Sequence, residues 1–388
     1  RYTIGGWDTL GVLRGQIMTM VEYHDTLIAG GQFTEASGTP CQGIAYYNGQ
    51  VWHPYGELEQ SVRRLRVLDD ELYAVGGFNI ADGQTASGVA KRVGNTWVPL
   101  GSIDYNGIVL IDVAKYDGKI VAVGDVNMDG GRGIIEWDGT DWHLLGPGII
   151  NGMSAARCLT VYQGDLYVGG QIALAPGNPG QNIMRWDGTE FQGLGQGIQW
   201  QLGNTTSIAT VLNLVEHNGV LFVGGGFRAA GGILADGLAT WDGAEWCAVP
   251  GDFTTSNGIW GMDFYYDTLF VACGWTLDGD SVNMAAKFVG EEYQAECSGP
   301  VGLPERARSP DALIAPNPAD EHVDLLFNSS HISLVSIHDA QGRLMFEQHH
   351  FGNARARIDV SNWPPGMYSA LIRNADAPAQ MERFVIMH

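Results

Sequence analysis

Short runs of alternating apolar and polar residues, each closed by a turn signal, recur through the first three hundred residues. Six copies begin at Tyr23, Leu68, Tyr116, Tyr162, His217 and Tyr265. The alternation, with its aromatic and β-branched residues, predicts β-strands, and the Asp-Gly and Asn-Gly pairs supply the positive φ angles of two-residue hairpins. We therefore predict six modules, each of four short antiparallel strands.

Modules of this kind at a spacing of about 40–50 residues are typical of β-propeller blades. The expected fold class is all-β, with a six-bladed β-propeller over residues 1–297. The strand-like segment Trp7–Gly11 would complete the last blade as its fourth strand and close the ring. The segment around Tyr293 competes for the same place, so a seven-bladed ring is the alternative.

The copy "GLATWDGAEWCAVPG", which ends at Gly251, shows the third and fourth strands with their Trp-Asp-Gly turn. Together with the Gly-Gly that follows most second strands, this pattern resembles the delta-60 and kelch-like repeats of secreted bacterial β-propellers. The resemblance covers residues 7–297 and implies the propeller fold. It implies no single function, because propellers serve many roles.

The repeat ends near Cys297, and residues 298–310 combine proline, glycine and charge without an apolar period, which predicts a linker. Residues 311–388 alternate strand-like runs with turns and predict a small β-sandwich. A carbohydrate-binding or fibronectin-like sandwich fits the same strand pattern, so the pattern alone leaves the role of this domain open.

The motifs of this second domain are more specific than its strand pattern. They are Pro316, Asn317 and Pro318, then Gly342 and Arg343, and then Gly366 and Tyr368 before a closing "RFVIM". This set resembles the type A sorting domain of type IX secretion cargo in Bacteroidota. The resemblance implies that residues 311–388 bind the secretion machinery. It also implies a mature protein outside the cell or on the outer-membrane surface, after removal of a signal peptide.

Charge and apolar content exclude several classes of protein. The formal net charge of −22 repels phosphate groups, which argues against nucleic-acid binding. No run of about eighteen apolar residues occurs, so we expect no transmembrane segment. The five cysteines show no metal-binding spacing, and export would make disulfides plausible while leaving their pairing open. They are Cys41, Cys158, Cys247, Cys273 and Cys297.

The loops of the modules differ in length according to their position. Turns between strands one and two, and between three and four, are short and uniform, whereas the remaining loops are long and different in every module. In an antiparallel blade these long loops share one face, where we expect a ligand to bind. Aromatic side chains that could stack on sugars or fill a partner's pocket are Tyr105, Trp200, Trp260 and Trp275. The alternative is that they pack the loops against one another.

One loop resembles a calcium-binding sequence. The stretch "DVNMDGGRGIIE" matches D-x-N-x-D-G-x5-E, whose oxygen ligands suit Ca²⁺. Glu136 aligns with strand residues of the sister modules, so we expect a shortened site. Its ligands would be Asp125, Asn127, Asp129 and the carbonyl of Gly131. A plain turn is the alternative, and no other cofactor is expected.

The sequence shows no catalytic signature such as GxSxG, HExxH or a phosphate loop. We therefore expect a non-enzymatic, secreted propeller that binds a protein or a glycan through its variable loops. One alternative is a secreted glycan-active enzyme with carboxylates at the propeller mouth. The other is a structural subunit of a surface appendage or matrix.

Overall fold

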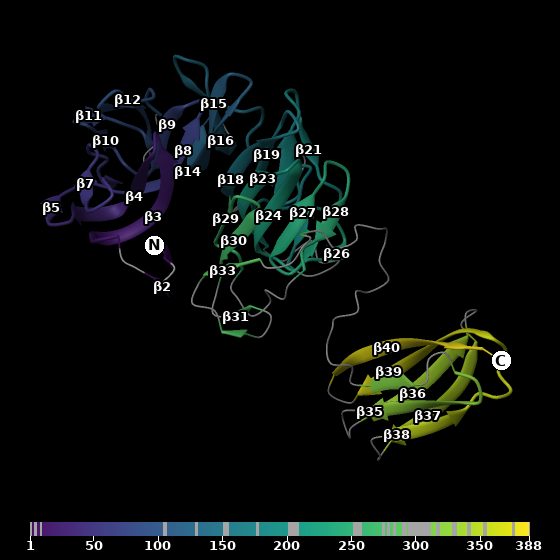
Figure 1. Ribbon diagram of the computed structural model, residues 1–388. Helices are drawn as coiled ribbons and strands as arrows, with labels where there is room; N and C mark the ends of the chain where they lie inside the picture. The colour runs from purple at the N-terminus through teal and green to yellow at the C-terminus, as the bar shows by residue number, and fades with distance from the viewer. Residues whose placement is uncertain are drawn as a thin grey trace. The chain divides into compact units, whose positions relative to one another are not determined.

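The computed structural model consists of β-strands, with no helix among the residues it describes, so the prediction of an all-β chain is confirmed. Those residues are 2–3, 6–7, 10–103, 107–128, 131–149, 155–175, 178–200, 209–250, 258–273, 276–277, 280–281, 285–288, 293, 312–315, 319–327, 332–339, 343–351, 355–374 and 377–387. The chain divides into two compact units, residues 1–302 and 303–388 (Figure 1).

Six antiparallel sheets follow one another along the first unit, and the first strand of each sheet in chain order is one of its edge strands. The first two sheets contain β3 (Leu13–Tyr23), β4 (Thr26–Ala36), β5 (Thr39–Pro40), β6 (Ile44–Tyr47) and β7 (Trp52–Pro54), then β8 (Val62–Leu68), β9 (Glu71–Gly76), β12 (Val89–Val93) and β13 (Thr96–Pro99). The third and fourth contain β14 (Val109–Tyr116), β15 (Lys119–Met128), β16 (Gly131–Trp137) and β17 (Trp142–Leu144), then β18 (Ala155–Tyr162), β19 (Asp165–Gln171), β20 (Ile183–Trp186) and β21 (Phe191–Gly193). The fifth and sixth contain β23 (Thr210–His217), β24 (Val220–Gly226), β27 (Leu238–Trp241) and β28 (Trp246–Ala248), then β29 (Gly261–Tyr265), β30 (Thr268–Ala272) and β33 (Ala285–Lys287).

Short strands lie outside these sheets and pair locally. They are β1 (Tyr2–Thr3) with β2 (Gly6–Trp7), β10 (Ile80–Ala81) with β11 (Gln84–Thr85), β22 (Ile198–Gln199) with β25 (Ala229–Ala230) and β26 (Ile233–Leu234), and β31 (Thr276–Leu277) with β32 (Asp280–Ser281). Among the described residues β2 pairs with β1, and the sixth sheet has three strands. Closure of the last blade by the N-terminal strand therefore stays a prediction.

A two-residue turn joins the first strand to the second in all six sheets. In the third sheet Tyr116 pairs with Lys119, and the turn residues Asp117 and Gly118 have φ angles of 47° and 75°. Both angles are positive, as a type I′ turn requires, and Asp and Gly tolerate that conformation. Asn218-Gly219 makes the same kind of turn in the fifth sheet, whereas the other four turns use other residue pairs, most of them also at positive φ.

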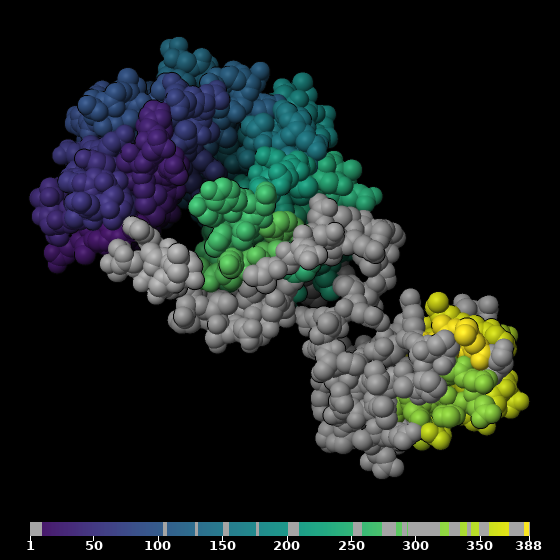
Figure 2. Space-filling view, viewed as in Figure 1, coloured from purple at the N-terminus to yellow at the C-terminus, as the bar shows by residue number. Residues whose placement is uncertain are grey.

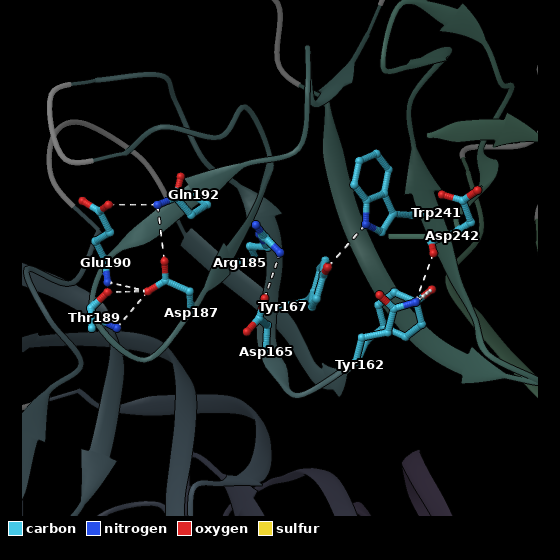
Figure 3. A network of polar contacts seen from close by, with 11 residues as sticks. Tyr162, Asp165, Tyr167, Arg185, Asp187, Thr189, Glu190, Gln192, Trp241 and Asp242 are labelled. Carbon is cyan, nitrogen blue, oxygen red and sulfur yellow. Dashed lines mark hydrogen bonds and ion pairs between the residues drawn. The ribbon is translucent and has the colours of Figure 1, made fainter. Parts of the chain in front are cut away.

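The apolar cores lie between neighbouring sheets. Successive first strands pack beside one another in the order β3, β8, β14, β18, β23 and β29 (Figure 1). Each main core cluster of the first unit joins two successive sheets, as when Val121 of the third packs with Leu159 of the fourth. At the next junction Trp241 Nε1 donates to Tyr167 Oη at 3.3 Å (Figure 3). Each sheet is thus stabilised by its neighbours.

Three tryptophans of the fourth strands make the same bond across a junction. Each donates its indole N–H to the carbonyl of the residue that directly follows the fourth strand of the preceding sheet. The donor and acceptor residues are Trp97 and Tyr55 (2.9 Å), Trp142 and Leu100 (2.7 Å), and Trp246 and Leu194 (3.0 Å). The "xWxxLG" pattern of the modules therefore supplies both partners of a contact between sheets.

We predict that Trp142→Phe costs about 2 kcal/mol of unfolding free energy and Trp97→Phe about 1 kcal/mol. Both changes leave a small cavity and remove the indole donor. The carbonyl of Tyr55 keeps a hydrogen bond from Arg92 Nη1 at 3.2 Å, which lowers the cost at Trp97. Urea unfolding of the two variants measures the difference, and Phe191 shows that phenylalanine fits this strand position. Equal losses of unfolding free energy in the two variants would show that the retained hydrogen bond to Tyr55 does not contribute to stability.

The first and the sixth sheet, the two ends of this series, differ from the sheets between them. Ile17 and Met20 of β3 and Phe270 of β30 are exposed. The residues at the position of Ile17 in the other five sheets are all buried, namely Val62, Leu110, Ala156, Val211 and Ile259. The five places where successive sheets meet are therefore packed, whereas the first and the sixth sheet each leave apolar side chains in solvent.

The second unit consists of two antiparallel sheets that share one core. One sheet contains β34 (Ala312–Ala315), β35 (His322–Phe327) and β38 (Arg355–Asp359), and the other β37 (Leu344–Phe351), β36 (Ile332–Asp339), β39 (Gly366–Asn374) and β40 (Ala377–Ile386). Val323 and Ile358 of the first sheet pack with Val335, Tyr368 and Phe384 of the second. Burial of alternate residues on facing sheets is the arrangement of a β-sandwich.

Candidate functional site

The two ends of each sheet in the first unit carry different kinds of loop. One end carries the short turns, in which Asp138 Oδ1 accepts hydrogen bonds from the N–H groups of Asp141 and Thr140, each at 2.8 Å. These bonds lower the pKa of the Asp138 carboxyl to about 2. Asp187 makes the same turn in the fourth sheet (Figure 3). The aspartates of the Trp-Asp-Gly repeats therefore hold turns together.

The opposite end, which we call the variable-loop face, carries the connections between sheets and the loops that follow the second strands. Trp200 and Trp260 belong to it, and they are 46% and 42% exposed. They are the only exposed tryptophans among those whose side chains the structure describes. The guanidinium of Arg228 lies 5.9 Å from the centre of the Trp200 ring. Tyr105 and Trp275 lie outside the described residues.

The predicted calcium loop is part of a β-hairpin in the third sheet. Asn127 pairs with Arg132, and Met128 pairs with Gly131, so the ladder of β15 and β16 continues almost to the turn. Asp125 and Asn127 are neighbours on one side of β15, and Asp129 lies outside the described residues. Within the described residues no three His, Cys, Asp or Glu side chains cluster as metal ligands do. Calcium binding here stays a prediction.

A buried ionic cluster lies among the first strands, where sequence analysis did not place a site. Asp112 of β14 is 0% exposed, and Arg66 of β8 donates to both its carboxylate oxygens, at 2.9 and 2.8 Å. The Nε atom of Arg64 lies 3.5 Å from Asp112 Oδ1. Burial opposes ionisation of Asp112, but the two guanidinium groups outweigh it, so its pKa lies below the ordinary value. A charged residue within the apolar strand "VLIDVAKY" was the available signal.

The position of Asp112 is polar in most of the first strands. Thr19, at that position in the first sheet, accepts from the N–H of Leu65 in the second at 3.1 Å. Asn213, at that position in the fifth, donates to the carbonyl of Ile259 at 3.1 Å. These side chains bond the first strand of one sheet to the first strand of the next. The sixth sheet has Gly261 at this position and so lacks such a side chain.

The cysteines of the first unit differ in state. Cys247 is disulfide-bonded, and Cys297 lies outside the described residues. Cys41, Cys158 and Cys273 are buried free thiols. Burial raises the pKa of Cys41 to about 11, which makes this thiol a poor nucleophile at neutral pH.

Three of the predicted sorting motif residues are described. Arg343 Nε, directly before β37, donates to Asp339 Oδ2, at the end of β36, at 2.6 Å. Tyr368 is buried in the core of the second unit and donates its hydroxyl to the carbonyl of Pro364 at 2.7 Å. Gly366 begins β39 at a φ of 156°. Pro316, Asn317, Pro318 and Gly342 lie outside the described residues.

Comparison with protein families shows which kind of domain the second unit resembles. Residues 313–387 match the family described as "Secretion system C-terminal sorting domain". The chain is therefore a protein marked for secretion, and its partner in export is the type IX secretion system that such domains address. No helix in the described residues is long and apolar enough to cross a membrane.

Comparison with known proteins adds little about the first unit. No curated protein sequence matches the chain. Among solved structures, the computationally designed Ika8 protein is 13% identical, with 96% of this chain and 98% of that chain covered and a TM-score of 0.40. The dihydro-heme d1 dehydrogenase NirN is 10% identical over 90% of this chain and 69% of that one, with a TM-score of 0.35. Neither likeness is strong enough to assign a function.

Proposed function

We propose that the chain is an exported six-bladed β-propeller that binds a protein or a glycan through its variable-loop face and performs no chemistry. The six sheets in sequence, with their first strands side by side and their cores between neighbours, support the ring. The pKa of Tyr265 on β29 is raised by Tyr266 and also by the carboxylate of Glu22 on β3, which supports proximity of the sixth sheet to the first. Figure 2 supports the same reading, with the green surface of β29 and β30 facing the purple surface of β3.

The exposure of Trp200 and Trp260 is the observation that carries the binding function. Most of the other described tryptophans are buried between sheets, where they contribute to packing. An exposed indole loses that stabilisation, yet it offers a large flat surface for a sugar ring or a partner's apolar side chain. The aspartates of the repeated turns accept hydrogen bonds from backbone N–H groups and so serve the turns. This supports ligand binding rather than glycan hydrolysis as the function of the first unit.

Replacing Trp200 and Trp260 together by alanine is expected to weaken ligand binding about tenfold or more. Aromatic side chains that become buried in a complex contribute most of its binding energy. The measurement is binding of the purified full chain to a glycan array and to surface proteins of the producing cell. The matched control is Tyr266→Ala, which removes an exposed aromatic residue from the opposite end of the sheets. Loss of binding in the control but not in the double variant would place the ligand at the other face.

A further inference from the structure

Six residues share one position relative to the six first strands: each lies five residues before the last residue that pairs with the second strand, and in the sixth sheet this places it directly before β29. We call them the bulge ring. They are Met18, Arg63, Ile111, Arg157, Leu212 and Trp260. In the first five sheets this residue is the extra residue of a β-bulge, skipped by the ladder to the second strand. In the sixth sheet Trp260 holds the same place, and its N–H donates to the carbonyl of Ala272.

The bulge ring is accessible to solvent, although it lies among buried residues. All six members are partly or fully exposed, whereas the residue before each is buried in every sheet but the first. A bulged residue is left out of the hydrogen-bond ladder, and its strand is the edge of the sheet nearest the other first strands. These side chains therefore project from the inner edges of the sheets, on the half of each strand next to the variable-loop face.

The charge of the bulge ring is opposite to that of the chain. It contains Arg63 and Arg157 and no acidic residue, in a protein of formal net charge −22. Most basic side chains of the first unit pair with an acid, as in Lys91 with Glu71 and Arg185 with Asp165. Among the described residues the side chains of Arg63 and Arg157 make neither an ion pair nor a hydrogen bond.

A third arginine adds to this surplus of positive charge. Arg66 already makes a bidentate pair with Asp112, so Arg64 is a second cation on a neutralised carboxylate. Arg64 Nε is buried without a hydrogen-bond acceptor among the described residues, and its side chain is 29% exposed. Asp263 of β29 also acts on Arg66. The six first strands together contain six basic residues and four acidic ones, namely Arg14, Arg63, Arg64, Arg66, Lys115 and Arg157 against Glu22, Asp112, Glu216 and Asp263.

We infer that the bulge ring binds the anionic group of a glycan, a carboxylate or a sulfate ester, through Arg63 and Arg157 while Trp260 stacks on the sugar ring. This inference rests on the proposed function and names its ligand class. Guanidinium groups bind carboxylate and sulfate through paired N–H donors, and an indole face covers the apolar face of a sugar. Arg64, next along the strand, supplies a further positive charge.

The test uses the full chain with polygalacturonate and its methyl ester, and with dextran sulfate and neutral dextran. Binding to an anionic polymer is expected, weakened by salt, with no binding to its neutral counterpart. The two pairs distinguish carboxylate from sulfate. The double change Arg63→Gln/Arg157→Gln should weaken binding by about tenfold or more. Lys91→Gln/Arg185→Gln removes the same two charges elsewhere and should leave binding unchanged.

Three results would overturn the inference. Equal binding by the Arg63→Gln/Arg157→Gln variant would exclude these arginines. Equal binding of polyglutamate through the same arginines would make the ligand an acidic peptide instead of a glycan. A third result is binding of a neutral glycan or a protein that depends on Trp200 and Trp260 but not on Arg63 and Arg157. It would support the proposed function and overturn the inference of an anionic glycan. If the Trp200→Ala/Trp260→Ala variant loses nothing toward any ligand, the proposed function itself fails.

Discussion

Replacing Asp112 by asparagine is expected to destabilise the first unit by about 3–5 kcal/mol, the usual cost of removing one partner from a buried ion pair. Asp112 is 0% exposed and neutralises Arg66 and Arg64 from the middle of the first strands. The amide of asparagine fills the same space but leaves two guanidinium groups without a counterion. The measurement is urea unfolding of the full chain, followed by tryptophan fluorescence.

The same ion pair makes this cost depend on pH. Because the pKa of Asp112 is lower in the folded protein than in the unfolded chain, its contribution is complete above the unfolded value of about 3.9. It is lost as the pH falls through the folded-state pKa. The difference in stability between the native protein and Asp112→Asn should therefore shrink in acid.

The control for this change is Asp138→Asn, an exposed turn aspartate whose acceptor oxygen asparagine retains. We expect only a small loss of stability there. If Asp112→Asn is no more costly than this control, the buried cluster is not an ion pair that the fold depends on.

The hairpins of the first unit could be predicted because their causes are local. A turn such as Asp117-Gly118 needs only two residues that accept positive φ, and the strands beside it carry their own alternation. The sorting domain could also be predicted, because its motif residues lie within one short part of the chain. The family match over residues 313–387 covers the same part. The expected export of the protein follows from that match.

Contacts between sheets could not be predicted, because their partners lie some fifty residues apart in the chain. Asp112 stands out as a charge within an apolar strand, but its partner Arg66 lies in another module, and only their packing together reveals the ion pair. The exposure of Ile17 and Met20 has the same cause. They follow the apolar pattern that is buried in the other sheets, and whether such a position is covered depends on the neighbouring sheet and not on the module itself. The bulge ring is recognised only when the pairing of the first and second strands is compared across all six sheets.

The calcium motif shows how one spacing fits two structures. Acidic residues at alternate positions can line a curved loop around a cation, or lie on one side of an extended strand. In this chain Asn127 pairs with Arg132 in the ladder of β15 and β16, and the proposed ligand Asp129 lies outside the described residues. Spacing alone cannot distinguish the two structures, and calcium binding stays a prediction.

Deleting residues 303–388 is expected to abolish export of the first unit to the cell surface while leaving its fold intact. The two units have separate cores, so removal of one exposes none of the buried clusters of the other. Export is read from the fraction of protein at the surface or in the medium of a bacterium with type IX secretion, compared with the fraction held in the periplasm. Circular dichroism of the retained protein checks its fold.

Two further variants separate recognition of the sorting domain from its mere presence. Val335→Asp places a charge in the core of the second unit and should block export as the deletion does, because the folded sandwich is what the machinery reads. Conversely, a periplasmic reporter fused to residues 303–388 should reach the surface. Normal export of the truncated chain, or retention of the reporter fusion, would show that the signal lies elsewhere. Surface delivery of the reporter would also show that the second unit is sufficient as an export signal, independent of the first unit.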